Sequence, residues 1–245
     1  MLTLLARTLR EGVMPDDIKR QSGEGLLFDT VEVKPEPALA EKVERAIRRR
    51  VGGRNLREAY FALSTEEPEV DFAVWQYLEQ LWTNGPRAAR DLAHPSVSRV
   101  FHAARKAARE FEKWIGVTRF QETGSVFYAA VAPSCDLLVL LAEHFAQRLP
   151  DNWFLHDVKR RKGAIHGRGQ WMVIGDLPDA RLPDVTEQER MYQALWQEFC
   201  QSVAIRERAN PRCQMNFLPK RLWRYLIESP DGQSRPATTL MPEQG

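Results

Sequence analysis

Two short basic segments contain the residues best suited to chemistry on a polyanion. The first, residues 159–162, reads KRRK and directly follows the apolar run WFLHDV, and Arg168 is assigned to the same cluster. The second, residues 206–224, contains the cations Arg206, Arg208, Arg212, Lys220, Arg221 and Arg224. Lysine and arginine neutralise phosphates, and an interleaved aromatic residue such as Trp223 can stack on unpaired bases. The two segments together predict a nucleic-acid-binding surface.

The cations of both segments are expected to contact nucleic acid. They are Lys159, Arg160, Arg161, Lys162, Arg212, Lys220 and Arg221. Asp157 is expected to orient Lys159 or Arg160 through an ion pair where the charged end of the strand emerges at the surface. Each cluster taken alone also fits a solvated rim at the end of an element, because charged side chains mostly face water. The presence of two clusters in one predicted domain is what favours a binding function.

Asp157 and Lys159 also permit an enzymatic interpretation, in which these two residues are catalytic. Magnesium nucleases combine two metal-binding acids with a lysine that helps to activate water. Asp151 lies too far along the same extended strand to be the second acid, so Glu122 or Glu143 would have to complete the site. A lysine can instead attack the aldehyde of an abasic sugar when neighbouring cations promote loss of its proton. Whether the protein is an enzyme is left open, and Mg²⁺ enters only under the nuclease alternative.

Several other kinds of site are absent at the level of motif. The cysteines Cys135, Cys200 and Cys213 have neither zinc-finger nor iron–sulfur spacing, and their scatter predicts a reducing cytoplasm without a disulfide framework. The sequence has no G-x-x-x-x-G-K loop, no G-x-G-x-x-G fingerprint and no G-x-S-x-G elbow. His156 and His166 could meet across strands, but histidines with satisfied hydrogen bonds are the expectation. The prediction is therefore no metal and no resident cofactor.

Composition predicts an ordinary globular protein with only local basic character. The 245 residues are 43% hydrophobic and 28% charged, and the formal net charge is +2. A charge so close to zero gives no global field for a polyanion, so any basic function must be local. The longest apolar run, CDLLVLLAEHFA, contains Asp136 and Glu143 and is shorter than the roughly 20 residues that a membrane span needs. We expect a cytoplasmic protein with no membrane partner.

The elements that position the basic segments form two predicted sections. Residues 1–90 are mostly helical. The elements expected there are helices over 2–11, 39–50 and 68–83, with a strand over 25–33. Residues 95–228 combine helices with strands, and residues 229–245 form a mobile tail. The prediction is an α+β protein in which the helical N-terminal section packs on an antiparallel sheet flanked by helices.

The α+β section is expected to place helices around two hairpins. The elements predicted there are a helix over 95–114, a hairpin around 122–124, a helix over 135–148 capped by Ser134, a strand at 153–158 and a hairpin around 167–169. The last long helix begins with a capping box of Thr186 and Glu189. Its buried stripe is expected to consist of Tyr192, Trp196, Phe199 and Val203.

Two long strings of the chain resemble a known bacterial family. The strings RFQETGSVFYAAVAPSCDLLVLLAEHFAQRLPDNWFLHDVKRRKGAIH and YQALWQEFCQSVAIRERANPRCQMNFLPKRLWRYL are similar to a family of DNA metabolism or DNA repair proteins. Members are typically encoded beside a radical-SAM protein, and some are fused to a uracil-DNA glycosylase domain. The recurring family strings match here at Asp157, Lys159, Arg160, Asn210, Pro211, Arg212, Gln214, Pro219, Lys220, Arg221 and Trp223.

The resemblance implies a DNA-binding accessory factor in DNA repair or modification, in which the cations of both segments contact DNA and Gln214 is a further DNA-contacting residue. The partners expected from it are DNA, a radical-SAM protein that performs the chemistry, and a protein of the uracil-DNA glycosylase type. Two alternatives stay open at this stage. One is the DNA-processing enzyme centred on Asp157 and Lys159, and the other is a protein–protein scaffold without affinity for DNA.

Overall fold

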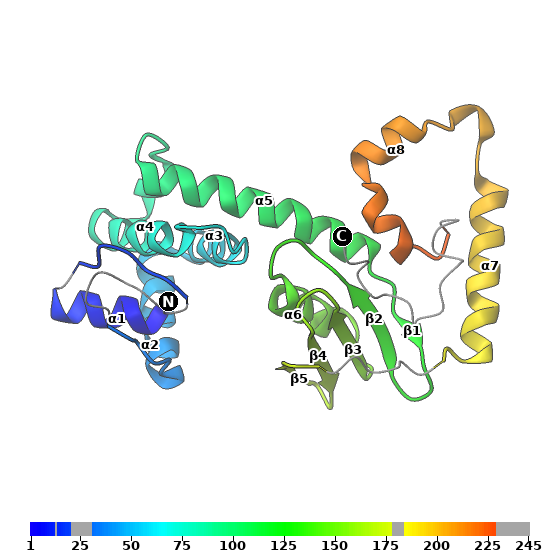
Figure 1. Cartoon of the computed structure of the whole chain (residues 1–245), viewed down its shortest axis with the longest axis horizontal. Coiled ribbons are helices and arrows are strands. Elements are labelled where there is room, and N and C mark those ends of the chain that lie inside the picture. Colours follow the sequence, from blue (N-terminus) through cyan, green and yellow to red (C-terminus); the bar gives the residue numbers. More distant parts are fainter. Residues whose placement is uncertain (13, 21–30, 178–183, 229–245) are drawn as a thin grey trace, which may run out of the picture. The chain divides into compact units, whose positions relative to one another are not determined.

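A computed structural model describes residues 1–12, 14–20, 31–177 and 184–228 (Figure 1). The chain divides into two compact units, Met1–Arg109 and Glu110–Gly245, so the division falls inside one long helix. The boundary predicted from the sequence, between residues 90 and 95, lies at the turn before this helix. Most of the predicted strand over 25–33 and the predicted tail over 229–245 lie outside the described residues.

The first unit is built from helices. They are α1 (Leu2–Glu11), α2 (Pro37–Val51), α3 (Gly53–Leu63), α4 (Val70–Asn84), the 3-10 helix η1 (Pro86–Arg90) and the first part of α5 (Pro95–Val117). The helices predicted around 2–11, 39–50, 68–83 and 95–114 are all present. The sequence reading missed α3, because it took the Gly52–Gly53 pair as a stop. Gly52 does end α2 with a φ of 87°, but Gly53 then starts the next helix.

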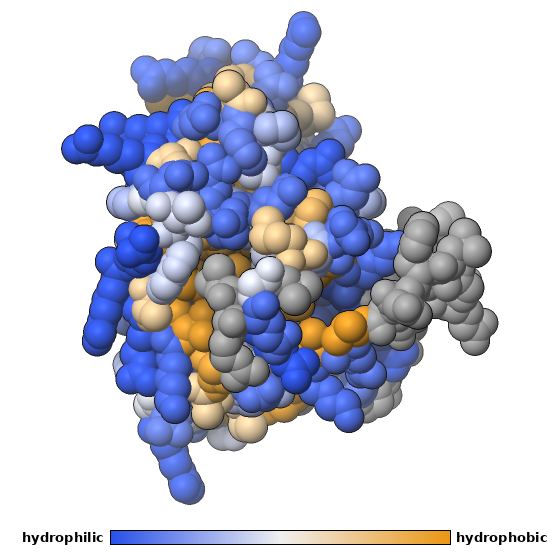
Figure 2. Space-filling view, turned by 90° about the vertical axis from the view of Figure 1, so that its left-hand side faces the viewer, coloured by the Kyte–Doolittle hydropathy of each residue, from blue (hydrophilic) through white to orange (hydrophobic). Residues whose placement is uncertain are grey.

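Apolar residues at helical spacing form the core of this unit. The buried face of α4 contains Val74, Trp75, Leu78 and Leu81, each at most 2% exposed. The Trp75 indole N–H donates a hydrogen bond of 2.9 Å to Thr8 Oγ1 and so satisfies the polar end of a buried aromatic side chain between α4 and α1. Hydrophilic side chains cover most of the face of the molecule drawn in Figure 2, with hydrophobic ones gathered in its lower half.

The second unit contains a five-stranded mixed sheet, so the predicted α+β class is confirmed. The strands are β1 (Gln121–Glu122), β2 (Phe127–Val131), β3 (Trp153–Asp157), β4 (Lys162–Gly167) and β5 (Gln170–Ile174), in the order β1-β2-β3-β4-β5. Both predicted hairpins are present, as the antiparallel pairs β1–β2 and β4–β5. β3 and β4 are also antiparallel, but β2 and β3 are parallel. The sheet is thus antiparallel at three of its four strand pairs, and the antiparallel prediction is corrected at β2–β3, because α6 (Leu138–Arg148) carries the chain back as a crossover.

Alternation along β3 separates a buried face of the sheet from a half-buried one. Trp153, Leu155 and Asp157 are fully buried, whereas Phe154 and His156 between them are half-buried. The buried face packs on α6, where the rings of Trp153 and Phe145 both contact Phe120. On the other face, a Cβ atom at Gly163 would collide with the Phe154 ring, so this position in β4 requires glycine.

Helices follow the sheet, and the longest of them leaves its apolar side uncovered. They are α7 (Glu187–Val203), η2 (Arg206–Arg208), α8 (Pro211–Phe217) and η3 (Lys220–Tyr225). The predicted cap of α7 is confirmed, since Thr186 Oγ1 accepts a hydrogen bond from the Glu189 amide. Its predicted buried stripe is wrong, because Tyr192, Trp196, Phe199 and Val203 are 55%, 42%, 54% and 57% exposed. The stripe has helical spacing, but the described residues of the unit do not cover it.

Membrane-spanning helices were also sought in the structure. Across residues 1–12, 14–20, 31–177 and 184–228, no helix combines the length and the apolar character needed to cross a bilayer.

Candidate functional site

The first basic segment lies at the carboxyl ends of the two parallel strands. β2 ends at Val131 and β3 ends at Asp157, and these two residues are partners in the sheet. The loop that follows β2 leads into α6, and the turn that follows β3 contains residues 158–161. Loops at the carboxyl ends of adjacent parallel strands form the crevice in which open α/β sheets place their ligands. The fold therefore brings the KRRK segment beside residues 133–136.

Asp157 is fully buried and closes the turn in which the basic residues lie. Its Oδ1 accepts hydrogen bonds from the backbone amides of Lys159 and Arg160 at 3.1 and 3.2 Å. Its Oδ2 accepts a hydrogen bond of 3.2 Å from Arg160 Nη1. The predicted ion pair is therefore present, with Arg160 and not Lys159 as the cation. Arg161, the next residue, adopts the left-handed region with a φ of 53° and completes the tight turn.

The Asp157–Arg160 pair is buried, although the charged end around it emerges at the surface as expected. The Asp157 side chain is 0% exposed and that of Arg160 is only 10% exposed. The loop after β2 covers Arg160, whose Nη1 donates to the Pro133 carbonyl at 3.0 Å and whose Nη2 donates to the Ser134 carbonyl at 2.9 Å. Arg160 therefore joins the two loops, because its own turn holds it through Asp157 while it donates to two carbonyl groups of the loop after β2. Lys159 and Arg161 on either side of it are exposed.

Glu110 of α5 holds the other side of the same loop. This residue is 7% exposed and accepts hydrogen bonds from the Ser134 amide at 2.8 Å, from the Ser134 hydroxyl, and from the Cys135 amide at 3.0 Å. The expectation that Ser134 caps the following helix is wrong, because α6 begins at Leu138 with Leu137 as its N-cap. The hydroxyl of Ser134 is used instead to bind the Glu110 carboxylate.

Arg221 brings the second basic segment to this loop. Its Nη2 donates a hydrogen bond of 3.1 Å to Glu110 Oε1, the same oxygen that accepts from the Ser134 amide. Arg160 and Arg221 come from segments far apart in sequence, yet Arg160 bonds Ser134 directly and Arg221 is linked to it through Glu110. We define the Ser134 site as Glu110, Ser134, Asp157, Lys159, Arg160 and Arg221. The structure thus brings one arginine of each predicted cluster to the same loop.

Burial and hydrogen bonding shift the pKa values of Glu110 and Asp157, the two carboxylates of the Ser134 site, in opposite directions. Burial alone would raise the pKa of Glu110, but the hydrogen bonds from Ser134 and Cys135 outweigh it and lower the pKa to about 2. For Asp157, burial is the larger effect and raises the pKa, although Arg160 opposes the increase. Glu110 is thus a fixed anion, and the charge of Asp157 depends on its bond with Arg160.

The other predicted DNA-contacting residues are distributed around this centre. Arg161 Nε donates to the Leu177 carbonyl at 3.1 Å, and Lys162 Nζ lies 3.2 Å from Asp136 Oδ2. Lys220 is exposed and its ammonium lies 5.9 Å from the centroid of the Trp223 ring.

The remaining candidates lie elsewhere in the second unit. Arg212 and Gln214 are exposed on α8, and within the described residues no hydrogen bond or ion pair joins their side chains to the Ser134 site. Arg168 lies at the opposite end of the sheet, because His166 pairs with Trp153 at the start of β3. Its assignment to the first basic cluster is therefore wrong.

Asp157 and Lys159, the pair predicted to be catalytic, both make hydrogen bonds within the Ser134 site. Both oxygens of Asp157 are engaged within its own turn, and Lys159 Nζ lies 3.5 Å from the Ser134 carbonyl. No group of three or more histidine, cysteine, aspartate or glutamate side chains is arranged to hold a metal in the part of the chain that the structure describes.

The two β3–β4 histidines do not meet. His166 is 3% exposed, donates from Nδ1 to the Asp151 carbonyl at 2.7 Å and stacks on Trp153. His156 faces Gly163 across the strands and shares a hydrogen bond of 3.0 Å with the Tyr128 hydroxyl. Both histidines therefore have hydrogen-bond partners, as the sequence analysis expected.

Sequence reasoning missed Glu110 and the role of Ser134, although one signal was present. Ala103, Ala107 and Trp114 occupy the buried stripe of α5, and Glu110 lies at the same spacing between Ala107 and Trp114. A carboxylate within an apolar helical stripe indicates a buried anion that needs donors from another element. Those donors come from residues 134, 135 and 221, which no local pattern connects to α5.

Comparison with known proteins gives one family. No curated protein and no solved structure matches the chain. The family model that matches residues 68–228 is described as a domain of unknown function, DUF4130, and this description names no activity. Because the match covers more than half of the chain, including every residue of the Ser134 site, the protein belongs to the DUF4130 family.

Proposed function

We propose that this protein is a DNA-binding accessory factor that contacts the phosphate backbone at the Ser134 site. The observation that carries the proposal is the convergence of the two basic segments on one loop, through Arg160 and the Ser134 carbonyl on one side and through Arg221 and Glu110 on the other. In line with the family resemblance, it would act in DNA repair or modification beside a radical-SAM protein that performs the chemistry.

The cations of this surface fall into a buried set and an exposed set. Arg160 is buried against Asp157 and fixes the turn. Lys159, Arg161 and Lys220 are exposed, and the Arg221 side chain is 50% exposed while it holds Glu110. Exposed cations on a rigid frame can neutralise phosphates without first losing conformational freedom. The frame residues therefore support binding by positioning, and the exposed ones would make the contacts.

The helix after the loop adds to the same electrostatic field. α6 begins at Leu138, directly after residues 133–136, so the positive end of its dipole faces the region of the Ser134 site. Asp157 and Glu110 offset part of the positive charge, but each is already paired with an arginine. The cations around the loop outnumber these carboxylates, which favours a polyanionic ligand.

Binding of fluorescein-labelled DNA by the full chain, followed by fluorescence anisotropy across a salt series, tests the proposal. Single-stranded, duplex and abasic-site oligonucleotides of equal length should be compared. We expect affinity to fall linearly with salt on logarithmic axes, and Lys159→Gln to weaken binding and reduce the slope by about 0.7–0.9. Arg168→Gln is the matched control, because it removes an exposed cation at the opposite end of the sheet.

The outcomes separate a specific surface from general attraction. A loss of affinity in Lys159→Gln together with unchanged binding in Arg168→Gln supports the proposal. Equal losses of affinity in the two variants would mean that DNA binding depends only on the overall charge of the protein. An absence of binding at low salt would remove the proposal and leave the Ser134 site as a structural ion-pair network.

A further inference from the structure

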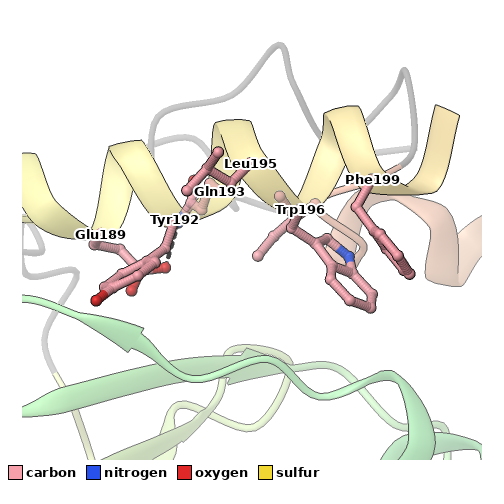
Figure 3. Close-up of a pocket in the computed structure, with 7 residues that line it drawn as sticks. Glu189, Tyr192, Gln193, Leu195, Trp196 and Phe199 are labelled. Carbon is pink, nitrogen blue, oxygen red and sulfur yellow. Dashed lines mark hydrogen bonds between the residues drawn. The ribbon is translucent and has the colours of Figure 1, made fainter. Parts of the chain in front are cut away.

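The apolar side of α7 forms an open groove in the second unit. Its lining includes Tyr192, Leu195, Trp196 and Phe199 of the helix and Ile227 of the following chain, and its volume is about 560 Å³. Tyr192, Trp196 and Phe199 project from the same side of α7 (Figure 3). We call this surface the α7 groove. A contiguous exposed apolar surface on a folded protein usually marks a site of interaction.

The groove is a fixed feature, because α7 is attached to the unit at two places. At its start, the Thr186 amide donates to the Glu122 carbonyl at 3.0 Å, and the Glu122 amide donates to Glu189 at 3.3 Å. Further along, Trp196 Nε1 donates to Glu228 at 3.1 Å and Gln197 donates to the Ile227 carbonyl at 3.0 Å. These bonds hold the helix near its start and near its middle and leave Tyr192, Trp196 and Phe199 exposed.

The charges around the α7 groove are mainly negative. Glu187, Glu189 and Glu198 lie on the helix, and Glu228 lies beside Trp196 with Arg119 Nη2 4.0 Å from its carboxylate. The helix carries one cation, Arg190, which is paired with Glu187 at 2.9 Å. Phosphates would be repelled from this rim, and a second copy of the chain would bring the same negative charge to the contact. A partner with basic residues beside an apolar face is complementary to it.

We propose that the α7 groove binds a basic amphipathic helix of a partner protein. The aromatic side chains recur along α7 at spacings of four and three residues, from Tyr192 to Trp196 to Phe199. A partner helix with apolar residues at similar spacing can interdigitate with this row, as helices do when they pack side by side. Lysine or arginine residues flanking its apolar face would then meet Glu198 and Glu228. This inference does not depend on DNA binding at the Ser134 site.

A synthetic peptide can test the chemistry of the occupant without knowledge of the partner. The probe is a fluorescein-labelled amphipathic helix of roughly 18 residues, with leucine on one face and lysine on the other. Its counterpart carries glutamate in place of every lysine. Anisotropy titration with the full chain should show binding of the lysine peptide and at least about tenfold weaker binding of the glutamate peptide.

Variants locate the binding to the groove. Trp196→Ala and Phe199→Ala should each weaken binding of the lysine peptide by about tenfold or more, because each removes a central aromatic anchor. Glu198→Lys should reverse the preference between the two peptides. Met172→Ala is the matched control, since Met172 is a 62% exposed apolar residue on β5, away from α7. DNA affinity should be unchanged in all of these variants, which separates this result from the outcome at the Ser134 site.

Three results would overturn the proposal. The first is equal binding of both peptides, and the second is an effect of Met172→Ala as large as that of Trp196→Ala. The third is a dimer, detected by sedimentation velocity, that Phe199→Ala dissociates, because that result would assign the groove to a second copy of the chain.

Discussion

The Ser134 site and the α7 groove lie in the same unit but differ in which side chains they bury and which they expose. In the Ser134 site, charged groups are buried, and Asp157 and Glu110 each accept several hydrogen bonds. In the α7 groove, aromatic groups such as Tyr192 and Phe199 are more than half exposed. Both arrangements are costly in isolation, since buried charge needs partners and exposed apolar surface orders water.

This difference indicates that the two regions are stabilised by different contacts. The buried charges are compensated by groups of the same chain, so the Ser134 site is complete and rigid. The apolar face of α7 is not covered by the described residues, so the proposed partner helix would supply the contacts that stabilise it. Substitutions should therefore affect folding strongly at the first region and weakly at the second.

The largest effect is expected from Glu110→Ala. The substitution leaves the Arg221 guanidinium and the amides of Ser134 and Cys135 without their acceptor. Removal of one partner from a buried charge network costs about 3–5 kcal/mol of unfolding free energy. Urea denaturation followed by circular dichroism measures this loss. Glu112→Ala is the control, because Glu112 is the exposed acid two residues along the same helix, and equal midpoints for the two variants would contradict the prediction.

A smaller loss is expected from Asp157→Asn. The asparagine oxygen can still accept hydrogen bonds from the backbone amides of Lys159 and Arg160, but the buried guanidinium of Arg160 loses its anionic partner. A hydrogen bond to a charged group contributes about 1.5–3 kcal/mol, so we expect a loss in this range. Hydrogen exchange should also quicken at the 158–161 turn. A turn as protected as in the unaltered protein would mean that the ion pair does not hold it.

Acid should weaken the Ser134 site through Glu110. Its pKa is lowered from 4.5 to about 2, so its contribution to stability is complete above pH 4.5 and disappears as the pH falls toward 2. We expect the urea midpoint of the unaltered protein to fall between pH 4.5 and 2.5, and that of Glu110→Gln to fall less. Parallel pH profiles for the two proteins would contradict this assignment.

The sequence predicted the elements of the Ser134 site but only part of its geometry. The KRRK segment was placed at a strand end from the apolar run before it, and the Asp157 ion pair was expected from local spacing. The contact between Glu110 and Arg221 joins residues more than 100 positions apart, and no periodic pattern specifies such a partner. The parallel pairing of β2 and β3 was missed for a similar reason, because strand direction depends on the path of α6.

For α7, the sequence predicted the local features of the helix but not the burial of its apolar face. Its cap and its apolar stripe were predicted correctly as local features, because both depend on spacing within one helix. The burial of the stripe was not, since periodicity shows that a face is apolar but not which molecule covers it. An apolar stripe on a helix is thus equally good evidence for a core contact and for a binding surface, and only the packing distinguishes them.

The smallest effect is expected from Phe199→Ala, and a matched substitution makes it informative. Phe145 of α6 is 6% exposed and packs on Phe120, whereas Phe199 of α7 is 54% exposed. Loss of a buried phenyl ring costs about 3–5 kcal/mol, so Phe145→Ala should strongly lower the urea midpoint. Surface substitutions away from structural features stay within about 0.5 kcal/mol, so Phe199→Ala should leave the midpoint almost unchanged. A large loss in Phe199→Ala would mean that its ring is covered within the protein in solution, and the two regions would then no longer differ in how they are stabilised.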